Sequence, residues 1–352
     1  MRILVDVMGG DHAPFETVKG AIDAAKEYAA DYTLIGDREQ IEKIADENGW
    51  DISSFTIVHT TDVMTMEDDP LSIRRAKKDC SMAIGLRMLA NGEGDAFVST
   101  GNTGALFTGA TLLVRRIPGI QRAALATVLP GTNPVMLLDC GANVVVEPDY
   151  LEQFAVMGSI YMKKMFSLES PRVALLNNGT ESCKGTPVHV EAYQKLSQSE
   201  CIHFVGNVEA NKIAIGACDV LVTDGFTGNI LLKNIEGLSK FLLGSIKEAL
   251  MANLLSKLGA IFVKKPIRAM KKSLDPNEYG GAPLLGIAHP VIKAHGSSNA
   301  KAFKNAIRQA IRYAESGMID EIAKEANVFA EKRKQEREAA RASSKNDVNA
   351  SV

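Results

Sequence analysis

The segment ILVDVMGGDH, residues 3–12, decides the architecture of this chain. A short apolar run of β-forming residues ends in a loop with two adjacent glycines, and helix-forming sequence follows from Phe15. Four more glycine-rich polar loops follow apolar runs, at residues 99–104, 139–143, 177–185 and 223–229. Glycine lets backbone amides approach a ligand closely, and Asn, Thr and Ser supply short polar groups. Because open α/β sheets bind ligands beyond the carboxyl ends of their strands, we expect the five loops to converge on one anion-binding crevice.

Strand-like runs alternate with helix-length amphipathic segments along most of the chain. The runs are short and apolar on both faces, which is typical of parallel strands covered by helices. The expected strands are residues 3–7, 32–35, 55–58, 96–99, 124–129, 135–139, 172–176, 202–205 and 220–223. The expected helices are residues 15–29, 38–47, 71–91, 103–114, 149–166, 188–198 and 227–252. This alternation predicts an α/β protein, a three-layer α/β/α sandwich around a mostly parallel sheet.

One part of the chain departs from this alternation. Between Ala123 and Cys140, two β-forming runs are joined only by the sequence PGTNP, residues 130–134. Proline, glycine and asparagine at such a junction are turn residues. We therefore predict an antiparallel hairpin inside or beside the sheet.

Composition bounds the class of protein. Of the 352 residues, 46% are hydrophobic and 23% charged, which indicates a globular protein with a large core. The formal net charge of -2 gives no general attraction to nucleic acid, so we expect no nucleic-acid partner. Five cysteines without a C-x-x-C pair are typical of the cytosol, and six histidines without ligand spacing predict no metal. No apolar stretch approaches the ~20 residues that span a bilayer, so we expect a cytoplasmic protein that can still touch a membrane surface.

The first glycine loop does not match a dinucleotide site. It has neither the order G-x-G-x-x-G nor the acidic residue about 20 positions later that such a site needs. We predict no cofactor. The loop residues Asp6, Asp11 and His12 suit a bound phosphate or a polarised carbonyl, and histidine titrates near neutral pH. The alternative is a tight strand-to-helix turn around a hydrogen-bonded Asp.

The loop at residues 177–185 offers a cation, Lys184. A lysine within a glycine loop can neutralise phosphate or the oxyanion of a tetrahedral intermediate, and a solvated surface charge is the alternative. Cys140 and Cys183 also lie in these loops. A nucleophilic cysteine needs a base or an electropositive site, and the sequence indicates no histidine partner for either thiol.

A cluster at residues 66–78 has acids before an expected helix start and bases within the helix. Arg74, Lys77 and Lys78 lie close enough in helical spacing to form one basic ridge. Such a ridge is either a solvated face or a docking surface for an acidic partner.

Two later segments have distinct compositions. Residues 253–273 hold six basic residues and no acid, interleaved with apolar residues. Pro266 should interrupt a helix there, so we expect a bent or two-part amphipathic projection. It can cover the core, form a dimer contact or lie on anionic lipid, and its basic, amphipathic composition favours the membrane surface. Residues 331–352 are dense in charged residues, Ala and Ser, and are expected to be a frayed helix end and a disordered tail.

Five motifs together carry a family resemblance. They are Asp6–Pro14 (DVMGGDHAP), Ser99–Gly104 (STGNTG), Asp139–Asn143 (DCGAN), Tyr279–Pro283 (YGGAP) and Val291–Gly296 (VIKAHG). In this combination and order the chain resembles the bacterial phosphate acyltransferases of phospholipid synthesis, the acyl-carrier-protein:phosphate acyltransferases. The resemblance covers about residues 1–320, within a single acyltransferase domain that we place at residues 1–325, and it does not cover the charged tail.

This resemblance implies a Rossmann-like fold related to phosphotransacetylases and isopropylmalate-type dehydrogenases. It implies a homodimer that transfers a long-chain fatty acyl group from acyl carrier protein to inorganic phosphate. The acyl phosphate would then serve a membrane glycerol-phosphate acyltransferase in phospholipid synthesis. The family's membrane-contacting projection maps onto residues 253–273, which makes the protein a peripheral membrane protein.

The chemistry agrees with loops of this kind. Phosphate is itself the nucleophile, so attack on a thioester needs placement and charge stabilisation more than an activated side chain. We assign catalytic roles to His12, Lys184, Lys293 and Asn229. Phosphate and the acyl thioester are assigned to Asp6, Gly9, Gly10, Asp11, Thr100, Gly101, Asn102, Thr103, Asn143, Asn177, Gly225 and Gly228. Carrier docking is assigned to Arg74, Lys77 and Lys78, and membrane contact to Leu254, Leu258, Ile261, Phe262, Lys264 and Lys265.

Three other functions are compatible with parts of the sequence. A short-chain phosphate acyltransferase using acyl-coenzyme A is the nearest, but a soluble donor gives no reason to approach lipid. A metal- and NAD-dependent hydroxyacid dehydrogenase on the same type of fold should show a carboxylate cluster. The third is a noncatalytic scaffold that recruits a lipid enzyme to the membrane.

Overall fold

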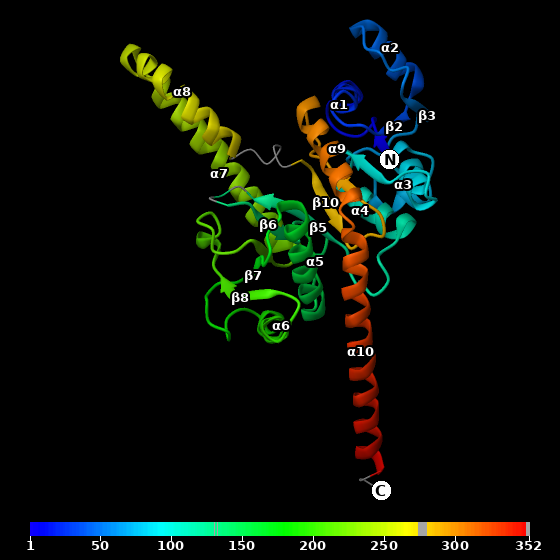
Figure 1. Ribbon diagram of the computed structural model, residues 1–352, viewed down its shortest axis with the longest axis vertical. Helices are drawn as coiled ribbons and strands as arrows, with labels where there is room; N and C mark the ends of the chain where they lie inside the picture. Colours follow the sequence, from blue (N-terminus) through cyan, green and yellow to red (C-terminus); the bar gives the residue numbers. More distant parts are fainter. Residues whose placement is uncertain (130, 132, 274–279, 350–352) are drawn as a thin grey trace.

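A computed structural model of the protein describes residues 1–129, 131, 133–273 and 280–349 (Figure 1). Within them, one eleven-stranded sheet has the order β3-β2-β1-β4-β11-β10-β5-β6-β9-β7-β8. The strands are β1 (Arg2–Asp6), β2 (Asp31–Gly36), β3 (Thr56–His59), β4 (Ala96–Ser99), β5 (Ala124–Leu129), β6 (Val135–Leu138), β7 (Arg172–Leu176), β8 (His203–Val208), β9 (Val220–Val222), β10 (Ala282–Leu285) and β11 (Val291–Lys293). The predicted mostly parallel sheet is confirmed, since only the pairs β11–β10, β10–β5 and β5–β6 are antiparallel among these residues.

Helices cover both faces of the sheet. They are α1 (Phe15–Ala25), α2 (Arg38–Asn48), α3 (Ser81–Ala90), α4 (Thr103–Gly109), α5 (Pro148–Phe166), α6 (Pro187–Ser197), α7 (Gly225–Met251), α8 (Leu254–Ser273), α9 (Ala300–Glu315) and α10 (Met318–Asn349). Short turns of other helix types are η1 (Pro70–Arg74), η2 (Ala110–Val114) and η3 (Ala210–Lys212). One core cluster packs α1, α5, α6, α9 and α10 on one face, and a second packs α3, α4 and the start of α7 on the other. The predicted three layers are therefore confirmed.

The three antiparallel pairs reverse the direction of the sheet at its centre. Strands β3, β2, β1, β4 and β11 run one way, and β6, β9, β7 and β8 run the other way. The predicted hairpin is the cause, because β5 and β6 pair antiparallel with Ala126 opposite Leu138. The five glycine loops consequently form two groups, one from each half of the sheet, rather than a single row along one edge.

Residues 71–91 do not form the single helix expected from the sequence. The chain makes the short turn η1, then a series of tight turns, and α3 begins only at Ser81. The amides of Arg75 and Lys77 both donate to the carbonyl of Ser72, at 2.9 Å each, which keeps this segment compact but not helical. The basic ridge predicted from helical spacing is therefore wrong in its geometry.

The projection is larger than residues 253–273. Helix α8 packs beside the outer part of α7, and the pair extends away from the sheet (Figure 1). Pro266 lies inside α8, which continues to Ser273 as one helix, so of the expected bent or two-part projection the two-part form is wrong. Proline removes one backbone donor, and the contact with α7 holds the remaining turns together. No helix in the described residues is long and apolar enough to cross a membrane.

Helix α10 extends to Asn349, through the segment expected to be frayed or disordered (Figure 1). Its sequence from Glu331 is rich in Ala, Glu, Lys and Arg, which have high helix propensity. The high charge that suggested disorder is equally compatible with a solvated helix.

Candidate active site

The loops after β1 and β4 form one compact group around the buried carboxylate of Asp6. Its oxygens accept hydrogen bonds from the Ser99 hydroxyl at 2.6 Å and from the Met8 amide at 3.2 Å. The Thr100 hydroxyl donates to the carbonyl of Gly9. A Cβ atom on Gly9 would lie 2.7 Å from the Gly101 amide nitrogen, so the two loops touch backbone to backbone. Asp6 therefore lies beneath the loops as their organiser, not at their surface.

Lys293 ends β11, directly beside β4, and lies under the same loops. Its side chain is buried, at 7% exposed, and its ammonium donates to the carbonyl of Thr100 at 3.1 Å and to that of Ala294. Burial lowers the pKa of Lys293 to about 8, while the carboxylates of Asp6 and Asp11 act in the opposite direction. An ammonium has three donors, so one N–H of Lys293 is left for a ligand.

Backbone amides beside Lys293 divide into occupied and available donors. The Gly101 amide donates to the Ser99 hydroxyl at 3.0 Å, and the Asn102 side chain accepts from the Ala105 amide at 3.0 Å. No hydrogen bond between described residues uses the amides of Gly10, Asn102, Thr103 or Gly104. Gly10 has a φ of +96°, which favours glycine. These amides and Lys293 are hydrogen-bond donors of the kind that bind an oxyanion or a phosphate.

The loops after β6 and β9 use their polar groups differently. The Asp139 carboxylate accepts from the amides of Gly141, Ala142 and Asn143, at 3.1, 3.0 and 2.6 Å. It also accepts from the Asn143 side chain at 2.8 Å, and that side chain is buried. Asn143 thus fixes the loop instead of facing a ligand.

The amides expected to bind phosphate at the start of α7 are occupied. That of Gly225 donates to the carbonyl of Asn143 at 2.7 Å, and that of Gly228 to the carbonyl of Asp224 at 2.9 Å. Gly225 and Gly228 instead allow close packing, since a Cβ on Gly228 would lie 1.9 Å from the Asp139 carbonyl oxygen. The side chain of Asn229 is exposed and near Gly141.

The loop at residues 177–185 is held by contacts of its own and by β8. The Asn177 side chain donates to the Lys184 carbonyl at 3.0 Å, and the Asn207 side chain donates to the Glu181 carbonyl at 2.7 Å. Lys184 is exposed, and no contact between described residues brings it to Lys293. Cys183 is also exposed, whereas burial raises the pKa of Cys140 well above its usual value and keeps it a thiol at neutral pH.

The first turns of α7 connect the two groups of loops. Lys233 and Glu236 form an ion pair of 2.9 Å there. Burial, together with the positive charge of Lys233, lowers the pKa of His295, which follows β11 two residues after Lys293. The charges of Lys233 and Glu236 also influence the pKa of the Cys140 thiol, in the loop after β6. The charged side chains in the first part of α7 therefore act on loop residues from both halves of the sheet.

Several residues of these loops were not assigned from the sequence. Asp139 and Ser99 organise loops, and His295 faces the charges of α7. Asp139 had a visible signal, because it directly follows an apolar strand as Asp6 does. His12, Asp11 and Thr103 are exposed near the first group, as a ligand-binding role requires.

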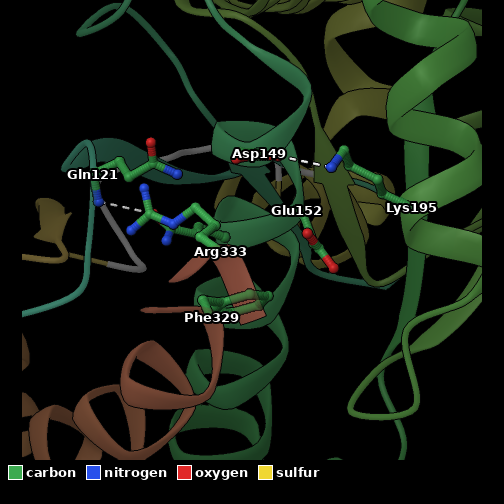
Figure 2. Close-up of a pocket in the computed structure, with 7 residues that line it drawn as sticks. Gln121, Asp149, Glu152, Lys195, Phe329 and Arg333 are labelled. Carbon is green, nitrogen blue, oxygen red and sulfur yellow. Dashed lines mark hydrogen bonds and ion pairs between the residues drawn. The ribbon is translucent and has the colours of Figure 1, made fainter. Parts of the chain in front are cut away.

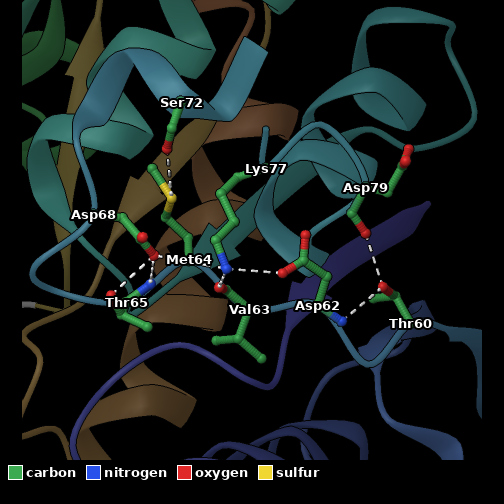
Figure 3. A network of polar contacts seen from close by, with 9 residues as sticks. All are labelled: Thr60, Asp62, Val63, Met64, Thr65, Asp68, Ser72, Lys77 and Asp79. Carbon is green, nitrogen blue, oxygen red and sulfur yellow. Dashed lines mark hydrogen bonds and ion pairs between the residues drawn. The ribbon is translucent and has the colours of Figure 1, made fainter. Parts of the chain in front are cut away.

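Of the residues assigned to carrier docking, Arg74 and Lys78 are exposed. Lys77 is not available for a partner, because its ammonium lies 2.9 Å from an Asp62 carboxylate oxygen and 2.9 Å from the Val63 carbonyl (Figure 3). The predicted membrane residues Leu254, Leu258, Ile261 and Phe262 are all exposed on α8. Lys264 and Lys265 are exposed as well.

A separate small pocket lies between α5, α6 and α10, away from the loops (Figure 2). Lys195 and Asp149 form a 2.9 Å ion pair at its edge, and Phe329 and Arg333 of α10 close another side. It contains none of the residues assigned to the site. Within the described residues, no group of three or more His, Cys, Asp or Glu side chains could hold a metal.

Comparison with known proteins identifies the family. A sequence model described as "Fatty acid synthesis protein" matches residues 1–321. The phosphate acyltransferase of Oceanobacillus iheyensis is 48% identical over 312 residues, 88% of this chain and 92% of that protein. The chain belongs to the phosphate acyltransferase family. The family member from Clostridioides difficile is 44% identical over 324 residues, 92% of this chain and 95% of that protein.

Solved structures share the fold of this phosphate acyltransferase family member at low identity. A phosphotransacetylase from Streptococcus pyogenes has a TM-score of 0.61 and 18% identity, covering 89% of this chain and 94% of that chain. A 4-hydroxythreonine-4-phosphate dehydrogenase from Klebsiella pneumoniae has a TM-score of 0.53 and 12% identity, covering 89% and 99%. The expected phosphotransacetylase- and dehydrogenase-like fold is confirmed, and the family membership makes the protein an acyltransferase.

Proposed function

We propose that this protein transfers a long-chain fatty acyl group from acyl carrier protein to inorganic phosphate, forming acyl phosphate for phospholipid synthesis. Membership of the phosphate acyltransferase family supports the acceptor. The observation that carries the proposal is Lys293, a buried cation with one spare donor beneath loops whose amides face no protein partner. Such a site suits a dianion that is itself the attacking group.

In the proposed reaction, a phosphate oxygen attacks the thioester carbonyl carbon and the carbon–sulfur bond breaks. Lys293 and the amides of Gly10 and Asn102 hold the phosphate and the developing oxyanion. The departing thiolate takes a proton, which we assign to His12 at the exposed end of the first loop. No covalent acyl-enzyme is needed, which agrees with the buried, protonated state of Cys140.

We also propose that the protein is cytoplasmic and works at the membrane surface. Helix α8 presents Leu258 at 59% and Phe262 at 81% exposure, with Lys264 and Lys265 beside them. Apolar side chains flanked by cations favour an anionic lipid surface. There the product would pass to a membrane glycerol-phosphate acyltransferase. A homodimer is part of the same proposal, and sedimentation velocity tests it directly.

The decisive test follows radiolabelled phosphate. Wild-type protein with long-chain acyl carrier protein should form labelled acyl phosphate. Lys293→Met should reduce turnover about 10²–10³-fold, as loss of an oxyanion donor does, or ~3–4 kcal/mol of barrier. Lys43→Met is the matched control and should stay within about threefold, because Lys43 is exposed on α2 and is not among the residues assigned to the site.

Each other outcome points to a different function. Label formed only from short-chain acyl-coenzyme A would replace the carrier-protein donor by a soluble one. If folded wild-type protein forms no labelled product from either donor, the result would favour the noncatalytic scaffold. Equal turnover of Lys293→Met and wild type would remove Lys293 from the mechanism.

A further inference from the structure

The segment from Asp62 to Asp79 forms the rim of the candidate site. The Asn102 side chain, at the start of α4, donates to the carbonyls of Thr65 at 3.3 Å and Met66 at 3.1 Å. A Cβ on Gly104 would lie 2.9 Å from a Pro70 side-chain carbon, so η1 also packs directly on α4. Whatever binds this segment is therefore next to the loop that carries the available amides.

Polar contacts of the Lys77 ammonium stabilise the inner side of this segment (Figure 3). Its ammonium contacts Asp62 and the Val63 carbonyl, each at 2.9 Å, and lies 3.9 Å from Asp68. The Asp68 carboxylate in turn accepts from the Thr65 amide at 2.7 Å. The hydrogen bond to Asp62 raises the pKa of Lys77, so this side chain stays charged and its contacts are made within the segment.

The outer side of the segment carries a different set of cations. Arg74, Arg75 and Lys78 are exposed, and Leu71 beside them is 62% exposed. The Lys78 amide donates to the Arg75 carbonyl, so a tight turn holds these two residues together. Among the nearby acids, Asp69 accepts from the Leu71 amide at 3.0 Å and Asp79 lies 3.5 Å from Arg87, while Glu67 is exposed. The three exposed cations outnumber Glu67 and Asp69 in this segment.

We propose that Leu71, Arg74, Arg75 and Lys78 form the docking surface for an acidic acyl carrier protein, an inference that rests on the function proposed above. The three cations supply charge complementarity, and Leu71 supplies an apolar anchor. The segment's contacts with Asn102 place the docked carrier at the mouth of the site. Lys77 has a different role, since it keeps the segment folded.

Two matched charge reversals test the surface. Arg74→Glu combined with Lys78→Glu should raise KM for acyl carrier protein about tenfold or more and weaken its dependence on salt. Turnover of acyl-pantetheine, which has no carrier protein, should stay unchanged. Lys43→Glu in α2 with Lys26→Glu directly after α1, both at exposed positions, is the control with the same change in net charge and should leave both values unchanged.

Direct binding separates this inference from the proposed function. Titration calorimetry with acyl carrier protein should show wild-type binding and at least tenfold weaker binding by the double variant. Binding that is equal in both, or missing in wild type, overturns the docking surface. Wild-type binding lost in the variant, without any acyl phosphate formed, overturns the proposed reaction and keeps the surface.

Discussion

At the scale of single residues, the site depends on one buried cation. Lys293 has a pKa of about 8 because burial disfavours its charge, although the carboxylates of Asp6 and Asp11 oppose that shift. The positive charge of Lys293 in turn contributes to lowering the pKa of His295. A lysine at this pKa is mainly protonated at pH 7 and loses its proton as pH rises through about 8.

This gives a first prediction about pH. If the charged form binds the phosphate dianion, kcat/KM calculated for the dianion should be nearly constant below pH 7 and should fall about tenfold per unit above pH 8. The phosphate dependence of turnover between pH 6.5 and 9.5 measures it. Lys293→Met should give a low, flat profile over the same range. A wild-type profile that is flat to pH 9.5 would contradict the role of the lysine charge.

Two glycines of α7 give a second prediction. Gly228→Ala would place a Cβ 1.9 Å from the Asp139 carbonyl oxygen, so the loop or the helix must shift, which should cost about 1–3 kcal/mol. Gly237→Ala, in the same helix with nothing within 4 Å, should be neutral or stabilising by about 0.5–1 kcal/mol. Chemical denaturation of both variants measures the difference, and equal stabilities would refute the close packing.

At the scale of elements, α7 and α8 form a paired projection from the globular body (Figure 1). Only Gly225 and Gly228 of α7 are buried, and α8 exposes most of its apolar residues. Exposed apolar side chains on a projecting pair need a partner surface, because a patch of this kind is rarely left in water.

The third prediction concerns this pair. Wild-type protein should sediment with vesicles containing anionic lipid, and Leu258→Glu with Phe262→Glu should abolish that sedimentation, since acids are repelled and apolar contact is lost. Val328→Glu is the control, because Val328 is 60% exposed on α10, outside the projection. The idea fails if the double variant sediments as wild type does. Turnover with soluble acyl carrier protein should persist in all variants.

At the scale of the whole molecule, α10 continues past the part shared with relatives. The family match ends at residue 321, whereas the helix runs to Asn349. Its first turns still belong to the fold, because Phe329 packs against the core and Arg333 donates to the Gly119 carbonyl at 3.4 Å. These contacts lie at the pocket between α5 and α10 (Figure 2).

A fourth prediction follows for truncations. Ending the chain after Lys334 should leave the Tm unchanged within about 1 °C, because the contacts of Phe329 and Arg333 are kept. Ending it after Ala326 should lower the Tm by several degrees, since full burial of a phenylalanine contributes about 1.5–3 kcal/mol and the partly buried Phe329 supplies a share of that. Differential scanning calorimetry of the two truncations decides, with acyl transfer as the check of folding. A Tm equal in both would show that α10 adds no stability beyond Ala326.

Local patterns were sufficient for much of this protein. Strands β1, β4, β5 and β7 and helices α2, α5 and α6 follow from apolar runs and amphipathic spacing, because these depend on neighbouring residues. Strands β10 and β11 were not predicted. They are short and are held by pairing with β5 and β4, which lie more than 150 residues earlier in the chain.

The sequence by itself determined the layered α/β class, the hairpin, the glycine loops and the family, because each depends on residue type and local order. Only the tertiary structure decided which loop amides are available. Asp6 and Asp139 both follow an apolar strand in the sequence. The Asp139 carboxylate accepts hydrogen bonds from the amides of Gly141, Ala142 and Asn143, whereas the loop above Asp6 has amides beside Lys293 that make no hydrogen bond within the described residues. The partner of a hydrogen-bond donor depends on which segments meet in space, and here the pairing of β4 with both β1 and β11 places Lys293 beside the loops after β1 and β4.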